Sequence, residues 1–133
     1  MGHHERVNFE IRPPDLAPPA AEYAHAVLSR GAERLLHTSG IVPTRLDGTV
    51  PDTLEDQVAQ VWHNIAAIVR SADLVLTDLV SITTYVVVGE PLGPVMAGRD
   101  AALQGHRVAS TLLTVPALAQ PSWKLEIAAV AAR

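Results

Sequence analysis

The residue best suited to chemistry is an acid in an apolar stretch near the C-terminal end of the chain. Glu126 lies in the run 123–130, whose other members are mainly aliphatic. A carboxylate is rarely buried without a partner or a task, because taking its charge out of water is costly. In an extended strand Glu126 shares one face with Lys124, Ala128 and Val130. It could hold or activate water there, or be an edge acid that is wetted by solvent or paired with Lys124 or an arginine.

Other side chains of catalytic type follow no established pattern. The six histidines have no metal-ligand spacing, and there is no cysteine, so we expect no metal and no cofactor. Ser39 and Ser110 lack the Gly-x-Ser-x-Gly frame of a nucleophile elbow. Tyr23 could present its phenol to a ligand, although an isolated tyrosine usually packs with one hydrogen bond. The residues alone predict an α+β domain with one notable acid.

Length and composition exclude several classes of protein. The 133 residues suffice for a single domain, and a hydrophobic fraction of 48% indicates a compact core. The net charge is −4 without a basic stripe, so nucleic acid is not an expected partner. No apolar run reaches the roughly 18 residues of a membrane span, and the N-terminus lacks the apolar core of a signal peptide. We therefore expect a cytoplasmic protein without a membrane partner.

The elements that must position Glu126 can be read from periodicity. We expect strands at 5–11, 34–39, 79–88, 109–118 and 123–130, the last two buried on both faces, and helices at 54–72 and 94–104. Residues 21–29 fit either a helix or a strand, and the four prolines within 13–19 predict a loop. Thr53 followed by Asp56 is close to a capping box for the first helix. Gly98 should weaken the second helix.

These elements predict one sheet with two helices on one face. The opposite face of the sheet then needs cover. Aromatic residues make up only 4% of the chain, so few large side chains are available for that purpose. Another copy of the same chain could supply the cover, since small domains often gain by burying surface in a symmetric oligomer.

Five segments together resemble the Rid family, the reactive intermediate deaminases, also called YjgF-like. Residues 23–27 are similar to the family's Pro-Tyr-Ser-Gln-Ala-Val segment, and 36–43 with Asp47-Gly48 to its Ser-Gly-Gln-Ile-Pro stretch. The remaining three are similar to its Gln…Asn-Ile helix, central strand and closing strand: 57–72, 80–88 and 125–131. The resemblance implies a single domain over 1–133 with a chorismate-mutase-like fold. That fold has a six-stranded, mostly antiparallel sheet with two helices on one face, and forms a homotrimer with small-molecule clefts between subunits.

The resemblance also implies roles for particular residues. In members that hydrolyse enamines and imines, a Glu on the last strand helps position the attacking water, and a Tyr near the N-terminus lines the cleft. Glu126 and Tyr23 match these two. The family's Arg, which opens the fifth strand and binds the substrate carboxylate, is replaced by Ala109. Loss of a bidentate guanidinium removes both affinity and orientation for a carboxylate.

The other residues expected at the substrate site are Ser39, Ser110 and Arg107. Arg107 precedes Ala109 by two residues, so in an extended strand it would point to the same face and could reach the cleft. The alternative, which we favour, is that Arg107 lies in the preceding loop and faces solvent. The sequence leaves open whether Arg107 or His106 enters the cleft.

Three functions remain compatible with the sequence. The first is water-dependent hydrolysis of an enamine or imine, a deamination, with an altered substrate range. The second is other acid/base chemistry, a tautomerisation, cyclisation or addition on a biosynthetic intermediate, in a homologue that no longer deaminates. The third is a non-catalytic trimer that binds a small ligand. We lean towards an enzyme of the first kind.

Overall fold

A computed structural model describes residues 6–133 of the chain. Its elements are, in order, β1 (Asn8–Ile11), β2 (Ala26–Ser29), β3 (Leu35–His37), α1 (Leu54–Ser71), the 3₁₀ turn η1 (Leu76–Asp78), β4 (Leu79–Val87), α2 (Gly93–Leu103), β5 (Ala109–Val115) and β6 (Leu125–Ala132). The ambiguous segment 21–29 therefore contains a strand. The expected helices and strands are all present, with ends that differ from the expected ones by a few residues.

The strands form two sheets, so the expectation of a single six-stranded sheet is wrong. Four strands pair in the order β3-β6-β4-β5, with β4 and β5 parallel and the other neighbours antiparallel. β1 and β2 form a separate antiparallel hairpin. It is joined to the larger sheet by one bridge, between Ala24 and Ala109, and by a hydrogen bond from Asn8 Nδ2 to the carbonyl of Ala132 (2.9 Å). β2 pairs with β1 over all four of its residues, and the ladder to β5 does not continue past Ala24.

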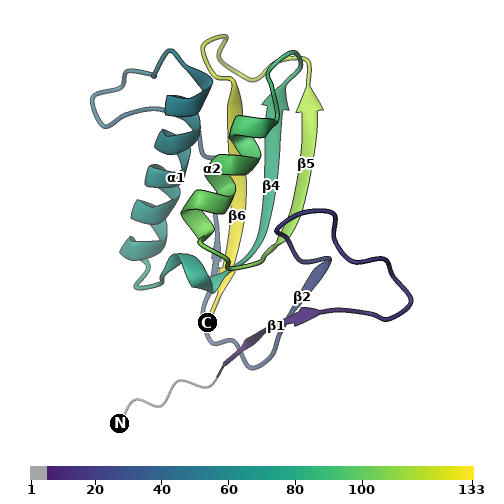
Figure 1. The fold of residues 1–133 in the computed structure, drawn as a ribbon. Coiled ribbons are helices and arrows are strands. Elements are labelled where there is room, and N and C mark those ends of the chain that lie inside the picture. The colour runs from purple at the N-terminus through teal and green to yellow at the C-terminus, as the bar shows by residue number, and fades with distance from the viewer. Residues whose placement is uncertain (1–5) are drawn as a thin grey trace.

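Both helices cover the same face of the four-stranded sheet, as expected (Figure 1). Leu125, Ile127 and Ala129 of β6 point to this covered face and are buried. The apolar stripe of α1 packs against them with residues that recur every three or four positions: Leu54, Val58, Val61, Ile65 and Val69. Neither helix within residues 6–133 is long and apolar enough to cross a membrane.

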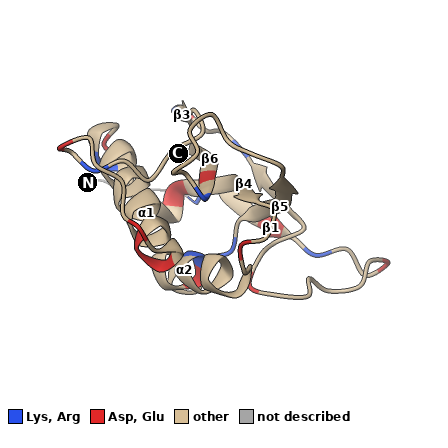
Figure 2. Cartoon of the chain, turned by 90° about the horizontal axis from the view of Figure 1, so that it is seen from above, with Lys and Arg blue, Asp and Glu red and all other residues tan. Residues whose placement is uncertain are grey.

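The face of the sheet away from the helices, called the open face below, is only half buried. The alternate residues of β6, including Glu126, Ala128 and Val130, are of intermediate exposure. On β5 the side chain of Leu113 is 38% exposed. The expectation that β5 and β6 are buried on both faces is therefore wrong for the single chain, because no element within residues 6–133 fully covers this face. Figure 2 shows acidic and basic residues dispersed over helices, strands and loops, without a basic stripe.

Polar residues of α1 fix the loops that lead into the sheet. Thr53 caps the helix, accepting from the backbone N–H of Asp56 (3.1 Å), which confirms the predicted start. Gln57 is only 1% exposed. Its amide donates to the carbonyls of Pro51 and Ser122 (both 2.8 Å) and accepts from the N–H of Lys124 (2.9 Å). Gln57 therefore joins the start of α1 to the start of β6.

Gly98 is a residue of α2 at its contact with α1. A Cβ at this position would overlap a methyl group of Val58, which is buried. The glycine that looked like a weakness of the second helix is therefore a packing requirement.

We predict that Gly98→Ala destabilises the protein. Overpacking a core contact costs roughly 1–3 kcal/mol, and the gain in helix propensity of about 1 kcal/mol offsets only part of it. Urea denaturation at fixed protein concentration measures the change. Gly93→Ala is the matched control, because a Cβ there meets nothing within 4 Å, and it should be neutral or slightly stabilising. In a Val58→Ala background, Gly98→Ala should no longer destabilise; an equal loss in both backgrounds would contradict the explanation.

Candidate functional site

Glu126 lies near the start of β6 on the open face. Its neighbour across the ladder is Tyr85 of β4. Lys124 pairs with Glu90 (Nζ–Oε2 3.4 Å), so the alternative of a Lys124–Glu126 pair does not hold. None of the ion pairs found among residues 6–133 involves Glu126. The carboxylate is thus half buried and has no cation bound to it.

A β-bulge places backbone next to this carboxylate. The chain pairs with β6 at His37, opposite Val130, and again at Ile41, opposite Ile127. Three residues lie between these points on the β3 side and two on β6, so one residue is extra. Thr38 fills the irregularity: its Oγ1 accepts from the N–H of Ala129 (2.9 Å) and donates to the carbonyl of Ser39 (2.7 Å).

Gly40 of this bulge contacts the Glu126 side chain. A Cβ on Gly40 would collide with the Oε2 and Cδ atoms of Glu126. Only glycine leaves room for the carboxylate in its present position. The next residues are held from the other side, since the Asn64 amide of α1 donates to the carbonyls of Val42 and Thr44 (both 3.0 Å). The bulge is therefore fixed by a strand on one side and a helix on the other.

Ala109 and Ser110 open β5, away from Glu126 in the single chain. Ala109 pairs with Ser81, which also pairs with Val130 of β6. Val130 is four residues beyond Glu126, so Ala109 and Glu126 differ by roughly 13 Å along the strands at about 3.3 Å per residue. Ser110 lies beside Ile82, which is buried on the covered face, so its side chain alternates away from the open face. One chain does not bring these residues to Glu126.

Arg107 lies in the loop before β5, as favoured, but does not stand free in solvent. Its Nε donates to both carboxylate oxygens of Glu10 (3.2 and 3.3 Å), and Nη1 is 3.6 Å from Glu22 Oε2. Arg12 also donates to Glu10 (2.9 Å). The hydrogen bond from Arg12 lowers the pKa of Glu10, Arg107 adds to that effect, and partial burial opposes it.

The remaining predicted residues are placed as follows. Tyr23 packs edge-to-face on His25, with ring centroids 6.1 Å apart, beside the bridge to β5. Ser39 is exposed and lies next to Gly40. His106 Nε2 hydrogen-bonds the carbonyl of Leu79 (2.7 Å). Within the described part of the chain, no three His, Asp or Glu residues are grouped so that they could hold a metal ion.

Comparison with known proteins decides the family. The family model described as Endoribonuclease L-PSP matches residues 15–133. The crystal structure of YyfB from Yersinia pestis, a Rid-family protein of unknown function, is 30% identical, with a TM-score of 0.87 over 96% of this chain and 100% of that one. The chain belongs to the Rid/YjgF family.

Two further crystal structures, both of Escherichia coli proteins, share the fold. The YjgF gene product is 30% identical with a TM-score of 0.70, covering 88% of this chain and 93% of its own. TdcF, solved with bound serine, is 22% identical with the same TM-score, covering 94% and 98%. A search of curated proteins found no match.

Glu126 of this Rid-family chain was recognisable from the sequence, whereas the residues that surround it were not. Tyr85 could have been found only from the register of β4 against β6. The contact with Gly40 had a weak signal, a Ser-Gly pair at the end of the strand predicted at 34–39. The ion pair between Glu10 and Arg107 joins residues 97 positions apart, and no feature of the sequence indicated it.

We predict that Thr38→Val loosens the bulge beside Glu126. The substitution keeps the shape but leaves the buried N–H of Ala129 without its acceptor, which costs about 1–3 kcal/mol. Urea denaturation gives the stability, and amide hydrogen exchange should accelerate at Ala129. Thr114→Val is the control and should change stability by less than about 0.5 kcal/mol, because Thr114 is exposed on β5 and does not lie on the open face. Unchanged exchange at Ala129 would argue against this role of Thr38.

Proposed function

We propose that this Rid-family protein hydrolyses an enamine or imine, with Glu126 as the residue that holds and activates water. The observation that carries the proposal is the state of Glu126: a half-buried carboxylate without an ion-pair partner in the described chain, kept accessible by Gly40. A carboxylate in that state can accept a proton from water, whereas one paired with a cation is a weaker base.

The chemistry needs one base that later acts as an acid. The substrate reacts as the protonated imine, which an enamine gives by taking up a proton at carbon. Water adds its oxygen to the carbon of the C=N bond, the π electrons move to nitrogen, and Glu126 takes one proton of that water, which leaves a neutral carbinolamine. Glu126 then gives this proton to the amino nitrogen, and the C–N bond breaks as the hydroxyl group loses its proton to the Glu126 carboxylate or to water and becomes the carbonyl. Ammonia or an amine and a ketone or aldehyde are the products. Backbone groups of the bulge and the hydroxyl of Tyr85 lie on the same side as Glu126 and can orient the substrate.

The substrate range should differ from that of family members that bind a carboxylate. Ala109 offers no charge at the start of β5, and Arg107 is held by Glu10 and Glu22. Two anionic partners reduce the attraction of that guanidinium for a third. We therefore propose a substrate whose reacting end carries no carboxylate.

The site is proposed to lie between subunits of a homotrimer. The open face carries exposed Leu113 and half-buried aliphatic side chains next to Glu126. Glu126 lies apart from Ala109 and Tyr23 in one chain, which supports a cleft that a second copy completes. Exposed apolar surface of this kind is typical of faces that associate.

We predict that Glu126→Gln lowers kcat/KM for imine hydrolysis by about 100-fold or more, the usual contribution of a general base. The test is a panel of imines generated in situ, charged and uncharged, with ammonia or amine release followed. Wild-type protein should act on uncharged imines and little on 2-iminopropanoate or 2-iminobutanoate. Glu33→Gln, which neutralises an exposed acid, is the control and should keep full activity.

Two results would count against this proposal, one against its substrate range and one against the hydrolysis itself. Rapid release of ammonia from 2-iminopropanoate, lost in Glu126→Gln, would overturn the proposed substrate range. No hydrolysis of any imine would favour the other acid/base reactions or ligand binding without turnover. Mass spectrometry of compounds that shift the melting temperature separates these two, because only a reaction changes the mass or structure of the bound compound.

We predict a solution mass near three times the 14.2 kDa of one chain, measured by light scattering. Leu113→Glu should shift the mass towards the monomer, because it places a charge on the apolar open face. Leu46→Glu is the matched control: that leucine is fully exposed in the turn before α1 and should leave the mass unchanged. A wild-type mass near 14.2 kDa would contradict the trimer.

A further inference from the structure

A groove of about 510 Å³ runs between α1 and α2. The two helices lie side by side over the sheet, so the groove follows both of them (Figure 1). Three exposed alanines line it, Ala59 of α1 and Ala97 and Ala101 of α2. Because alanine is too small to fill the space between two helices, the buried residues Val58 and Trp62 line it as well. The volume is in the range of sites for small molecules.

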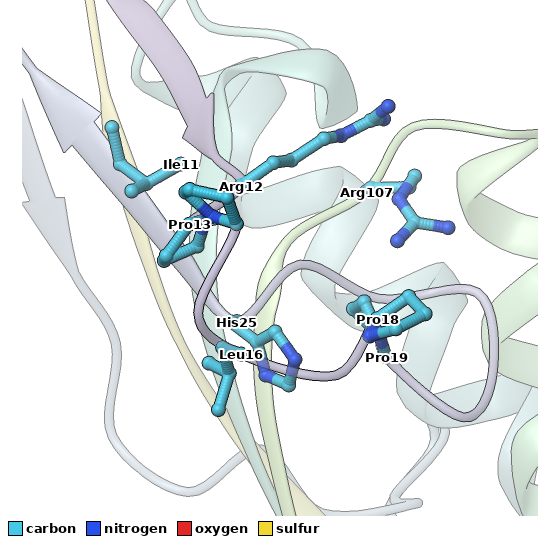
Figure 3. A pocket seen from close by; sticks show the side chains of 9 residues that line it. Ile11, Arg12, Pro13, Leu16, Pro18, Pro19, His25 and Arg107 are labelled. Carbon is cyan, nitrogen blue, oxygen red and sulfur yellow. The ribbon is translucent and has the colours of Figure 1, made fainter.

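The groove is separate from the proposed hydrolytic site and from the hairpin. Its lining residues all belong to the two helices, which cover the face of the sheet opposite Glu126. It shares no residue with the hollow beside the proline-rich loop, which Figure 3 shows with Arg107 and His25 at its walls. A ligand in the groove therefore depends neither on Glu126 nor on the trimer.

Trp62 carries a hydrogen-bond donor that lacks an acceptor. Its side chain is only 5% exposed, and its indole Nε1 is buried without a hydrogen-bond partner within residues 6–133. A buried tryptophan N–H usually finds a partner, because an unpaired polar group in a dry place is destabilising. Trp62 also lines the groove. A turn of its ring would bring the N–H to an acceptor there, and would supply the hydrogen bond that the chain itself does not make.

Glu55 places a negative charge at another point of the groove. It is the only charged side chain among the described residues that line the groove, and it is exposed. None of the ion pairs found among residues 6–133 involves it. Trp62 follows it by seven residues, or two helical turns, so the two lie on the same side of α1 about 10 Å apart along the axis. The groove therefore favours a cation at one end and an acceptor at the other.

We propose that this groove binds a small amine with an apolar body and a carbonyl group. The ammonium group lies at Glu55, the body lies between the alanines, and the carbonyl oxygen accepts from Trp62 Nε1 after the ring has turned. An exposed ion pair contributes little, because water solvates both charges well. Most of the affinity therefore comes from burial of the apolar body and from the hydrogen bond to the indole.

Calorimetric titration of the full chain with matched probes tests the proposal. Ethyl 4-(aminomethyl)benzoate has the amine, the ring and the ester carbonyl, and should bind one molecule per chain. The analogue 4-butylbenzylamine has no acceptor and should bind about tenfold more weakly, although it is more apolar. The uncharged ester, ethyl 4-methylbenzoate, should bind about threefold more weakly. No binding of the amino ester, or equal binding of the amino ester and the butyl analogue, would overturn the proposal.

Variants of the two polar residues then assign the contacts. Trp62→Phe keeps an aromatic ring but has no N–H, so the amino ester should lose its tenfold advantage over the butyl analogue. Glu55→Gln should weaken both amines about threefold and leave the uncharged ester unchanged. Asp56→Asn is the matched control, because it removes the same charge from the same turn of α1 at a residue that does not line the groove, and it should affect none of the probes.

A variant that fills the groove locates the binding even where Trp62→Phe does not fold. Ala59→Phe adds a ring from an exposed position and should abolish binding of the amino ester. His63→Phe is the control, because it adds a ring at an exposed position of α1 outside the groove, and it should bind as wild type does. Unchanged binding in Ala59→Phe, or a retained preference for the ester in Trp62→Phe with unchanged circular dichroism, would place the ligand elsewhere and refute the assignment.

Discussion

The buried amide of Gln57 is the contact on which the arrangement around β6 depends. It satisfies three backbone groups, at Pro51, Ser122 and Lys124, in a place where water cannot replace it. An unpaired polar group there would cost more than the net gain from any one of these bonds. These three hydrogen bonds therefore fix the path by which the chain passes from the preceding loop into β6. Because side chains of a strand alternate, fixing Lys124 also fixes the face on which Glu126 emerges.

A second constraint acts on Glu126 from the neighbouring edge. The bulge around Thr38 inserts one residue and brings Gly40 over the carboxylate. β6 is paired on both sides, with β3 and with β4, so its backbone has little freedom to adjust. The acid is thus held by a rigid strand and bounded by backbone that carries no side chain. In this position the carboxylate is accessible to water or a small molecule, while its own motion is restricted.

Much of this fold was predictable from local patterns, whereas the surroundings of the acid were not. The α1 helix, its Thr53 cap and the alternation around Glu126 all depend on residues close together in sequence, and each was predicted correctly. The predicted number of sheets was wrong. Whether β2 pairs with β1 or with β5 depends on contacts between residues far apart in the sequence, and no local periodicity indicates which pairing forms. Gln57 is buried although its side chain is polar. Its burial follows from three backbone groups that come together only in the folded chain.

The position of the cations explains why this chain should treat carboxylates differently from an enzyme with an arginine opening β5. A guanidinium at Ala109 would project from a paired strand onto the open face, the face of Glu126. Arg107 lies outside the strand, and Glu10 of the hairpin draws its guanidinium towards the proline-rich loop. An arginine at position 107, two residues before Ala109, therefore has its charge at the hairpin and not on the sheet, because its carboxylate partner there is Glu10.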